Sequence, residues 1–163
     1  VIVMDLIAMR IRGKACVYKK GETFTLAGEE GLQSAMKSKE ETTYSAMPKN
    51  LTEIPANLSS LQVAKLFFYL GSVNENLELW KELLGPYSLS HSGNLKGRSK
   101  SWWRNLTTKN RKYIYIREDE KRAKPNDKTY LFQIIEKGKD SGPAKPIRVT
   151  KTDGEWKVTS AVP

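Results

Sequence analysis

Apolar and polar residues alternate most clearly in the last third of the chain. Residues 112–116 and 129–135 are mainly β-branched or aromatic, a composition that is typical of strands. Residues 147–150 and 156–159 alternate strictly between apolar and polar side chains. The Asp-Gly pair at 153–154 indicates a tight hairpin, because glycine accepts the positive φ of such a turn. The pattern predicts four consecutive strands of one antiparallel sheet.

The first two of these strands are apolar on both faces. In the first strand, tyrosines at 113 and 115 alternate with isoleucines at 114 and 116, and the second strand is similar. Strands of this kind are covered on both sides. Helices can cover only one side, so we expect the other side to be closed by an N-terminal hairpin, by the wall of a curled sheet, or by a second subunit.

Two helices are predicted before the sheet. Asn57 or Ser59 can cap the first helix, whose apolar residues recur at helical spacing until Gly71 ends it. Asn74 can cap the second helix, which Pro86 terminates because proline cannot continue the hydrogen-bond ladder. Their connection is short, so we expect the two helices to lie side by side. Residues 101–106 are predicted to form a very short helix that leads into the sheet, after a surface loop at residues 87–97.

The first part of the chain gives weaker signals. Residues 2–11 fit a strand or a short helix equally well, and residues 14–18 and 22–26 are typical of a hairpin. Residues 29–37 form a short helix candidate with acidic residues at its start and a lysine at its end, as the helix dipole favours. Residues 39–57 are predicted to be a long loop.

Length and composition favour one α+β domain, residues 1–163, in which residues 1–56 are the less certain part. The predicted architecture is a curved antiparallel sheet of about four or more strands packed on two main helices, with an N-terminal hairpin and short helix. A chain of 163 residues, 39% hydrophobic and 28% charged, has room for one core. The net charge of +10 favours anionic partners without selecting one.

Several classes of protein are disfavoured by the residues that are scarce. Cys16 and His91 are the single cysteine and histidine, which excludes the usual Cys/His zinc sites. We interpret His91 as a surface residue and Cys16 as a small buried strand residue, and we expect no metal and no cofactor. No run of 18 apolar residues indicates a membrane span. The chain starts with Val rather than Met, which leaves a removed upstream segment open, so no compartment is predicted.

The final hairpin, Lys-Thr-Asp-Gly-Glu-Trp-Lys-Val at residues 151–158, and the helix pair before it are similar to a known family. Residues 57–163 resemble the nuclear transport factor 2-like fold, in which a strongly curved sheet wraps around helices to form a cone. Residues 1–56 do not match the plain version of the family, whose first helix lies nearer the start.

This resemblance implies either an enzyme or a small binding domain. The isomerases of the family use a carboxylate base and a phenol or protonated acid inside the cone. In this chain Asp127, Asp140 and Asp153 fall in turns, so the catalytic pattern is carried over to no position. A buried carboxylate within hydrogen-bond reach of a cavity-facing tyrosine would indicate an isomerase or dehydratase.

Aromatic residues of the helices and strands form the first candidate site. They either line a pocket for a small apolar ligand or simply fill the core. The candidate pocket residues are Phe67, Tyr69, Trp80, Tyr113, Tyr130, Phe132 and Trp156.

An acid-free basic stretch, residues 83–117, forms the second candidate site. Its cations are interleaved with aromatic residues at positions 102, 103, 113 and 115, the ingredients of a single-strand nucleic-acid groove. The alternatives are another anionic partner, or a solvated basic loop whose tryptophans anchor it to the core. The candidate polyanion contacts are Lys96, Arg98, Lys100, Arg104, Lys109, Arg111 and Lys112.

Together these patterns favour a small non-enzymatic binding or interaction domain that acts through a concave pocket or through sheet pairing, including pairing into a homodimer. The alternative is binding of nucleic acid or another polyanion through residues 96–117. An enzyme of isomerase or dehydratase type is the third hypothesis.

Overall fold

The computed structural model describes residues 6–11, 14–19, 25–26, 44, 47 and 51–163. The chain divides into two compact units, Val1–Thr42 and Thr43–Pro163. The organisation of the chain as a single domain stays a prediction.

The N-terminal unit contains a small antiparallel sheet. Its strands are β1 (Leu6–Ile11), β2 (Lys14–Lys19) and β3 (Thr25–Leu26), in the order β1-β2-β3. The predicted hairpin corresponds to β2 and β3, in which Cys16 lies opposite Leu26. Of the segment 2–11, which fitted a strand or a helix equally well, the described residues Leu6–Ile11 form a strand, because β1 pairs along its whole length with β2. The helix predicted at residues 29–37 lies outside the described residues.

The C-terminal unit is built on the predicted antiparallel meander. Its strands are β4 (Arg111–Glu118), β5 (Asp127–Glu136), β6 (Lys139–Asp140), β7 (Lys145–Thr152) and β8 (Glu155–Ala161). Their order is β4-β5-β7-β8, and the short β6 also pairs with β5. A 3-10 helix, η2 (Glu120–Arg122), connects β4 to β5. The predicted α+β class and antiparallel sheet are therefore confirmed.

Burial along β4 and β5 follows the prediction of two apolar faces. Tyr113 and Phe132 belong to the main core cluster and are fully buried. On the opposite faces of the same strands, Ile114 and Ile135 are buried outside that cluster, whereas Ile116 is 38% exposed. The register shifts between positions 115 and 117 in β4, and irregularities of this kind increase the local twist of a strand.

Among the described residues, the α-helices α2, α3 and α4 precede the C-terminal sheet. The first, α2 (Ser60–Ser72), begins with a capping box in which the Ser59 hydroxyl accepts from the Gln62 N–H while the Gln62 side chain accepts from the Ser59 N–H. Ser59, one of the two predicted caps, is confirmed. The helix continues through Gly71 to Ser72.

The second helix, α3 (Leu77–Glu82), is capped by Asn76 rather than by the predicted Asn74. The side-chain Oδ1 of Asn76 accepts from the Leu79 N–H at 3.2 Å. Asn74 instead donates its N–H to the Tyr69 carbonyl at 3.0 Å, so it belongs to the turn that ends α2. Glu75 has a φ of 52°, which redirects the chain before α3 can begin.

The third helix, α4 (Arg98–Leu106), is longer than the predicted segment 101–106. Gly97, with a φ of 51°, separates it from the preceding loop. That loop begins with a 3-10 helix, η1 (Pro86–Ser88). The Ser99 hydroxyl fixes the first turn of α4 by donating to the Ser88 carbonyl at 2.5 Å.

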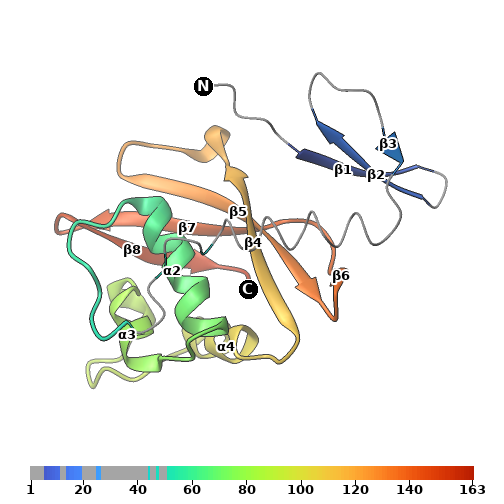
Figure 1. The fold of residues 1–163 in the computed structure, drawn as a ribbon. Coiled ribbons are helices and arrows are strands. Elements are labelled where there is room, and N and C mark those ends of the chain that lie inside the picture. The colour runs from blue at the N-terminus through green and yellow to red at the C-terminus, as the bar shows by residue number, and fades with distance from the viewer. Residues whose placement is uncertain (1–5, 12–13, 20–24, 27–43, 45–46, 48–50) are drawn as a thin grey trace. The chain divides into compact units, whose positions relative to one another are not determined.

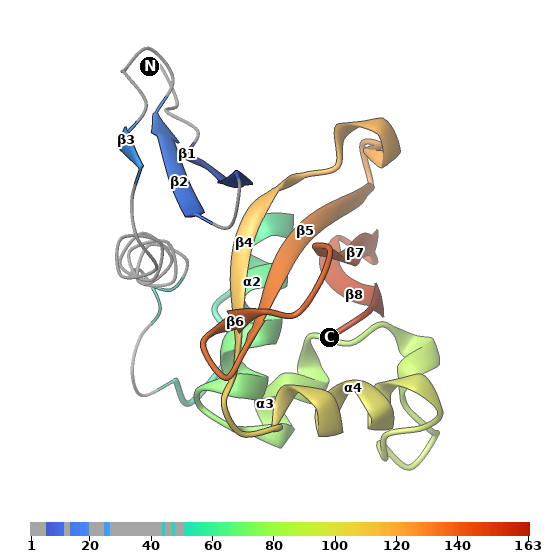
Figure 2. The same ribbon diagram turned by 90° about the vertical axis from the view of Figure 1, so that its right-hand side faces the viewer.

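Helix α2 lies across one face of the sheet and contacts β4, β5, β7 and β8 (Figure 1). Helices α3 and α4 lie beneath the sheet near the C-terminal end of α2 (Figure 2). The core between these layers is rich in aromatic residues. Phe68 of α2 lies between Tyr113 and Phe132, with ring centroids 4.7 and 4.3 Å away.

The segment after α3 is tied directly to the last strand. Val158 donates its N–H to the Leu83 carbonyl at 2.7 Å and accepts from the Gly85 N–H at 2.9 Å. These two bonds form a parallel bridge at the outer edge of β8. The helical part and the end of the sheet are thus joined by backbone hydrogen bonds as well as by packing.

Candidate functional site

The seven aromatic pocket candidates lie in the interior of the C-terminal unit. Six of them are buried in the core cluster and Trp156 is half-buried against it. The rings of Phe67 and Trp80 are 5.1 Å apart, and the Trp80 Nε1 donates to the Phe67 carbonyl at 3.1 Å. Packing of this density favours the alternative in which these residues fill the core. The six buried residues are Phe67, Tyr69, Trp80, Tyr113, Tyr130 and Phe132.

Trp156 also lines a small surface pocket of about 290 Å³. Its walls come from residues 54–58, the end of α3 and the β7–β8 hairpin, and the other six aromatic candidates are not among its lining residues. Lys157 places its Nζ 2.8 Å from both the Glu155 carboxylate and the Glu82 carbonyl. Lys157 holds the pKa of Glu155 below its usual value. The Lys157 ammonium and the Glu155 carboxylate at this pocket are therefore already paired with each other.

The hydroxyls of two buried tyrosines have hydrogen-bond partners, which for Tyr113 include the Arg111 side chain. Tyr130 and Ser60 share a hydrogen bond of 2.7 Å, and Tyr113 donates to the Asn105 carbonyl at 3.1 Å. Burial raises the pKa of both tyrosines. Among the described residues, the buried polar side chains are serines and a threonine, without a carboxylate. The arrangement that would indicate an isomerase is not formed by this part of the chain.

Helix α4 and the residues just before and after it expose five of the basic candidates to solvent. The inner face of α4 buries Ser99, Trp102 and Leu106, whereas Arg98, Lys100 and Arg104 point outward. This division follows from the sequence, because apolar residues four apart lie on the same side of a helix. We call the exposed side chains of Lys96, Arg98, Lys100, Arg104 and Lys109 the basic surface.

The cations of the basic surface are not neutralised by neighbouring acids. Within the described part of the chain, none of these five side chains forms an ion pair. The remaining two candidates differ from them. Arg111 is half-buried with its Nη2 3.3 Å from the Glu136 carboxylate, and Lys112 is exposed on β4. The structure therefore leaves five of the seven candidates, on and beside α4, exposed and without an ion pair among the described residues.

Helix α4 is held firmly against the rest of the unit. The Trp102 ring packs edge-on against Phe67 at 6.2 Å, and Asn105 donates its side-chain N–H to the Pro163 carbonyl at 3.3 Å. At the C-terminal end of α4, Leu106 packs so closely on Gly71 that a Cβ at Gly71 would lie 2.6 Å from the Leu106 Cδ1. These contacts fix the position of α4, which carries three of the side chains of the basic surface.

The aromatic residues that accompany the cations in the sequence do not lie on the basic surface. Trp102 is 7% exposed, and Trp103 packs against Trp80 at 5.1 Å. Tyr113 is fully buried, and Tyr115 packs against Phe132 at 5.6 Å. These contacts favour the interpretation that the aromatics anchor the stretch to the core. An aromatic residue missed by the sequence reasoning, Tyr87, is 89% exposed in the same acid-free stretch.

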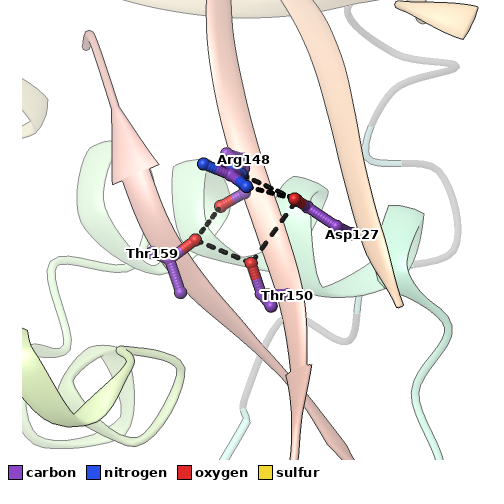
Figure 3. Close-up of polar contacts among 4 residues, drawn as sticks. All are labelled: Asp127, Arg148, Thr150 and Thr159. Atoms are coloured by element: carbon purple, nitrogen blue, oxygen red, sulfur yellow. Dashed lines mark hydrogen bonds and ion pairs between the residues drawn. The ribbon is translucent and has the colours of Figure 1, made fainter. Parts of the chain in front are cut away.

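A separate polar network stabilises the sheet across β5, β7 and β8 (Figure 3). Arg148 forms a bidentate ion pair with Asp127, and the Thr150 hydroxyl lies 2.9 Å from that of Thr159. Arg148 lowers the pKa of Asp127. Every charged group drawn here has its partner within the network, so we interpret it as structural.

Neither a metal-ligand cluster nor a membrane-spanning helix occurs in the part of the chain that the structure describes. There, no three residues of the types His, Cys, Asp and Glu are grouped as metal ligands would be. No described helix has the length and apolar character needed to cross a membrane. His91 is exposed in the loop before α4.

No family model matches the chain, and no curated protein matches it significantly.

Proposed function

We propose that this protein is a non-enzymatic binding protein that binds polyanions on the basic surface of α4. One observation carries the proposal: five exposed cations lie on and beside one helix, in an acid-free stretch, and form no ion pair within the described residues. Positive charge that is not neutralised by nearby acids attracts polyanions. When lysine and arginine side chains neutralise phosphate or sulfate groups, the counterions condensed on the polyanion are released.

The arrangement of cations on α4 is unfavourable for the helix itself. Lys100 and Arg104 are four residues apart and therefore face each other along the helix, at a cost of about 0.2–0.5 kcal/mol. The first turn has no acidic residue, although an acid there would complement the helix dipole. Since helix stability does not account for these choices, they support a role in binding.

The net charge of the chain adds a long-range component. A formal charge of +10 accelerates encounter with an anionic polymer, and this acceleration weakens as salt screens the field. The basic surface supplies the local contacts once the polymer has arrived.

Charge substitution tests the proposal directly. We expect Lys100→Gln with Arg104→Gln to elute earlier than the wild-type protein from a heparin column. We also expect its affinity for a labelled oligonucleotide to fall less steeply with salt, by about 0.7 in log–log slope for each lost phosphate contact on a single strand.

The matched control removes the same charge elsewhere. Lys121 and Lys124 are also exposed lysines, and Lys121→Gln with Lys124→Gln lowers the net charge equally. Equal losses in both double variants would show that only net charge matters and would contradict a site on α4. Absence of retention by the wild-type protein at low salt would refute polyanion binding itself.

We further propose that residues 57–163 have a nuclear transport factor 2-like fold. The support comes from α2 lying across one face of a twisted antiparallel meander (Figure 1) and from the β7–β8 hairpin around Gly154. The core aromatics occupy the space between helix and sheet, so the proposed binding surface lies outside the sheet's concave face.

A further inference from the structure

Tyr87 is the most exposed of the large hydrophobic side chains that the structure describes. It is 89% exposed, compared with 57% for Val73 and 48% for Val162. A tyrosine usually buries its ring and keeps only its hydroxyl in water, so an aromatic ring presented almost entirely to solvent suggests a binding role.

The backbone around Tyr87 is fixed on both sides. The preceding Gly85 donates its N–H to the Val158 carbonyl of β8 at 2.9 Å, and Pro86 opens the 3-10 helix η1. The following Ser88 carbonyl accepts from the Ser99 hydroxyl at 2.5 Å and from the Lys96 N–H at 3.3 Å. Tyr87 therefore directly precedes Ser88, whose carbonyl is bonded to Ser99 in the first turn of α4 and to Lys96 of the basic surface.

From this placement we propose that Tyr87 is a stacking platform for one base of a single-stranded nucleic acid, whose phosphates lie along Lys96, Arg98 and Lys100. The inference rests on the proposed function and names its partner. Single-strand binding combines a positively charged track with an accessible aromatic face, and Tyr87 supplies the face that Trp102 and Trp103 do not.

Other anionic partners fit this surface less well. Binding in the plane of a membrane requires an apolar helix face, and the apolar face of α4 is buried in the core. The neighbours of Tyr87 add no exposed apolar area, since Leu89 and Leu95 pack partly against the core. A duplex keeps its bases stacked on one another, so an aromatic face gains a contact only on an unstacked strand.

The test compares two probes that differ only in their bases. Fluorescence anisotropy would measure binding of oligothymidylate and of an abasic oligonucleotide of the same length to the full chain. We expect Tyr87→Ala to weaken oligothymidylate binding by about fivefold or more and to leave abasic binding unchanged. Tyr87→Phe keeps the ring and should bind both probes as the wild-type protein does.

The outcomes separate this inference from the proposed function. If the wild-type protein and Tyr87→Ala bound oligothymidylate with the same affinity, and the abasic probe with the same affinity, base stacking on Tyr87 would be overturned while polyanion binding would remain supported. Binding of neither probe, together with no retention on heparin at low salt, would refute the proposed function as well. Binding of phosphatidylserine vesicles in place of oligothymidylate would overturn the choice of nucleic acid. Because Tyr87 is exposed, an unchanged melting temperature of Tyr87→Ala should confirm that the variant is folded.

Discussion

Replacing Gly71 by alanine should destabilise the contact that positions α4. A Cβ at residue 71 would lie 2.6 Å from the Leu106 Cδ1 and 2.8 Å from the Leu106 Cβ, whereas ordinary contacts begin near 3.4 Å. Leu106 is 1% exposed, so it has no open space into which to turn. The Cβ of Leu106 can withdraw by the required fraction of an ångström only if the backbone of α4 moves with it.

The expected magnitude is a balance of two terms. Overpacking a well-filled core costs about 1–3 kcal/mol. Alanine in place of glycine inside a helix returns up to about 1 kcal/mol, and less here because Gly71 lies in the last turn of α2. We therefore expect Gly71→Ala to lower the free energy of unfolding by about 1–2 kcal/mol.

Urea unfolding followed by tryptophan fluorescence measures this change. Trp80, Trp102 and Trp103 all lie in or against the core near α4, so their emission reports its packing. Ser72→Ala, one residue farther along, serves as the control: it removes only the hydroxyl bond to the Phe68 carbonyl. We expect its effect to be smaller than that of Gly71→Ala.

A double-mutant cycle identifies the contact responsible. Leu106→Ala alone should cost about 2–5 kcal/mol through the cavity it leaves. In that background Gly71→Ala should cost about 1 kcal/mol less than it does in the wild type, because the Leu106 Cγ and Cδ1 atoms are gone. The reasoning would be refuted if Gly71→Ala proved as stable as the wild type, or if the two changes were strictly additive.

Two further predictions concern the buried tyrosines. Tyr130→Phe should lower the free energy of unfolding in urea by about 1–2 kcal/mol, because it leaves the buried Ser60 hydroxyl without its 2.7 Å partner. Adding Ser60→Ala should recover part of this loss. A double variant less stable than Tyr130→Phe would contradict this explanation. Burial raises the pKa of Tyr113, so above about pH 10 the unfolded state releases protons that the folded state retains, and the free energy of unfolding falls as pH rises. Tyr113→Phe should show a shallower decline in urea titrations between about pH 10 and 11. Equal slopes for the two proteins would exclude Tyr113 as the source.

Local features of the C-terminal sheet could be predicted from the sequence because they depend on neighbours along the chain. Alternation located β7 and β8, and the Asp153-Gly154 pair located their hairpin, in which both residues have positive φ values of 51° and 85°. The Ser59 cap of α2 is equally local. Each of these signals lies within a few residues of the structure that it forms.

Features that depend on distant residues could not be predicted in the same way. Gly71 was interpreted as the end of a helix, but its missing side chain admits Leu106 of α4. The bridge between Leu84 and Val158 has no local signal, since neither residue reveals its partner. Asn74 and Asn76 are equally good caps by type, and only the turn at Glu75 decides between them.

The two candidate sites show the same division. Most cations of the acid-free stretch are exposed, as expected of charged side chains that are not paired, whereas Arg111 is half-buried and pairs with Glu136. The role of each aromatic depended on packing: Trp102 entered the core and Tyr87 did not. The signal available for Tyr87 was its place directly after Gly85-Pro86, where a turn projects the chain outward.

The backbone bonds between Val158 and the residues after α3 have a consequence for synthesis on the ribosome. The Leu83 carbonyl and the Gly85 N–H find their partners only when residue 158 has left the exit tunnel. Until then, the helical half carries unpaired backbone groups and an uncovered aromatic surface, both of which chaperones recognise. A nascent chain should therefore acquire protease resistance in one late step rather than gradually as its helices emerge.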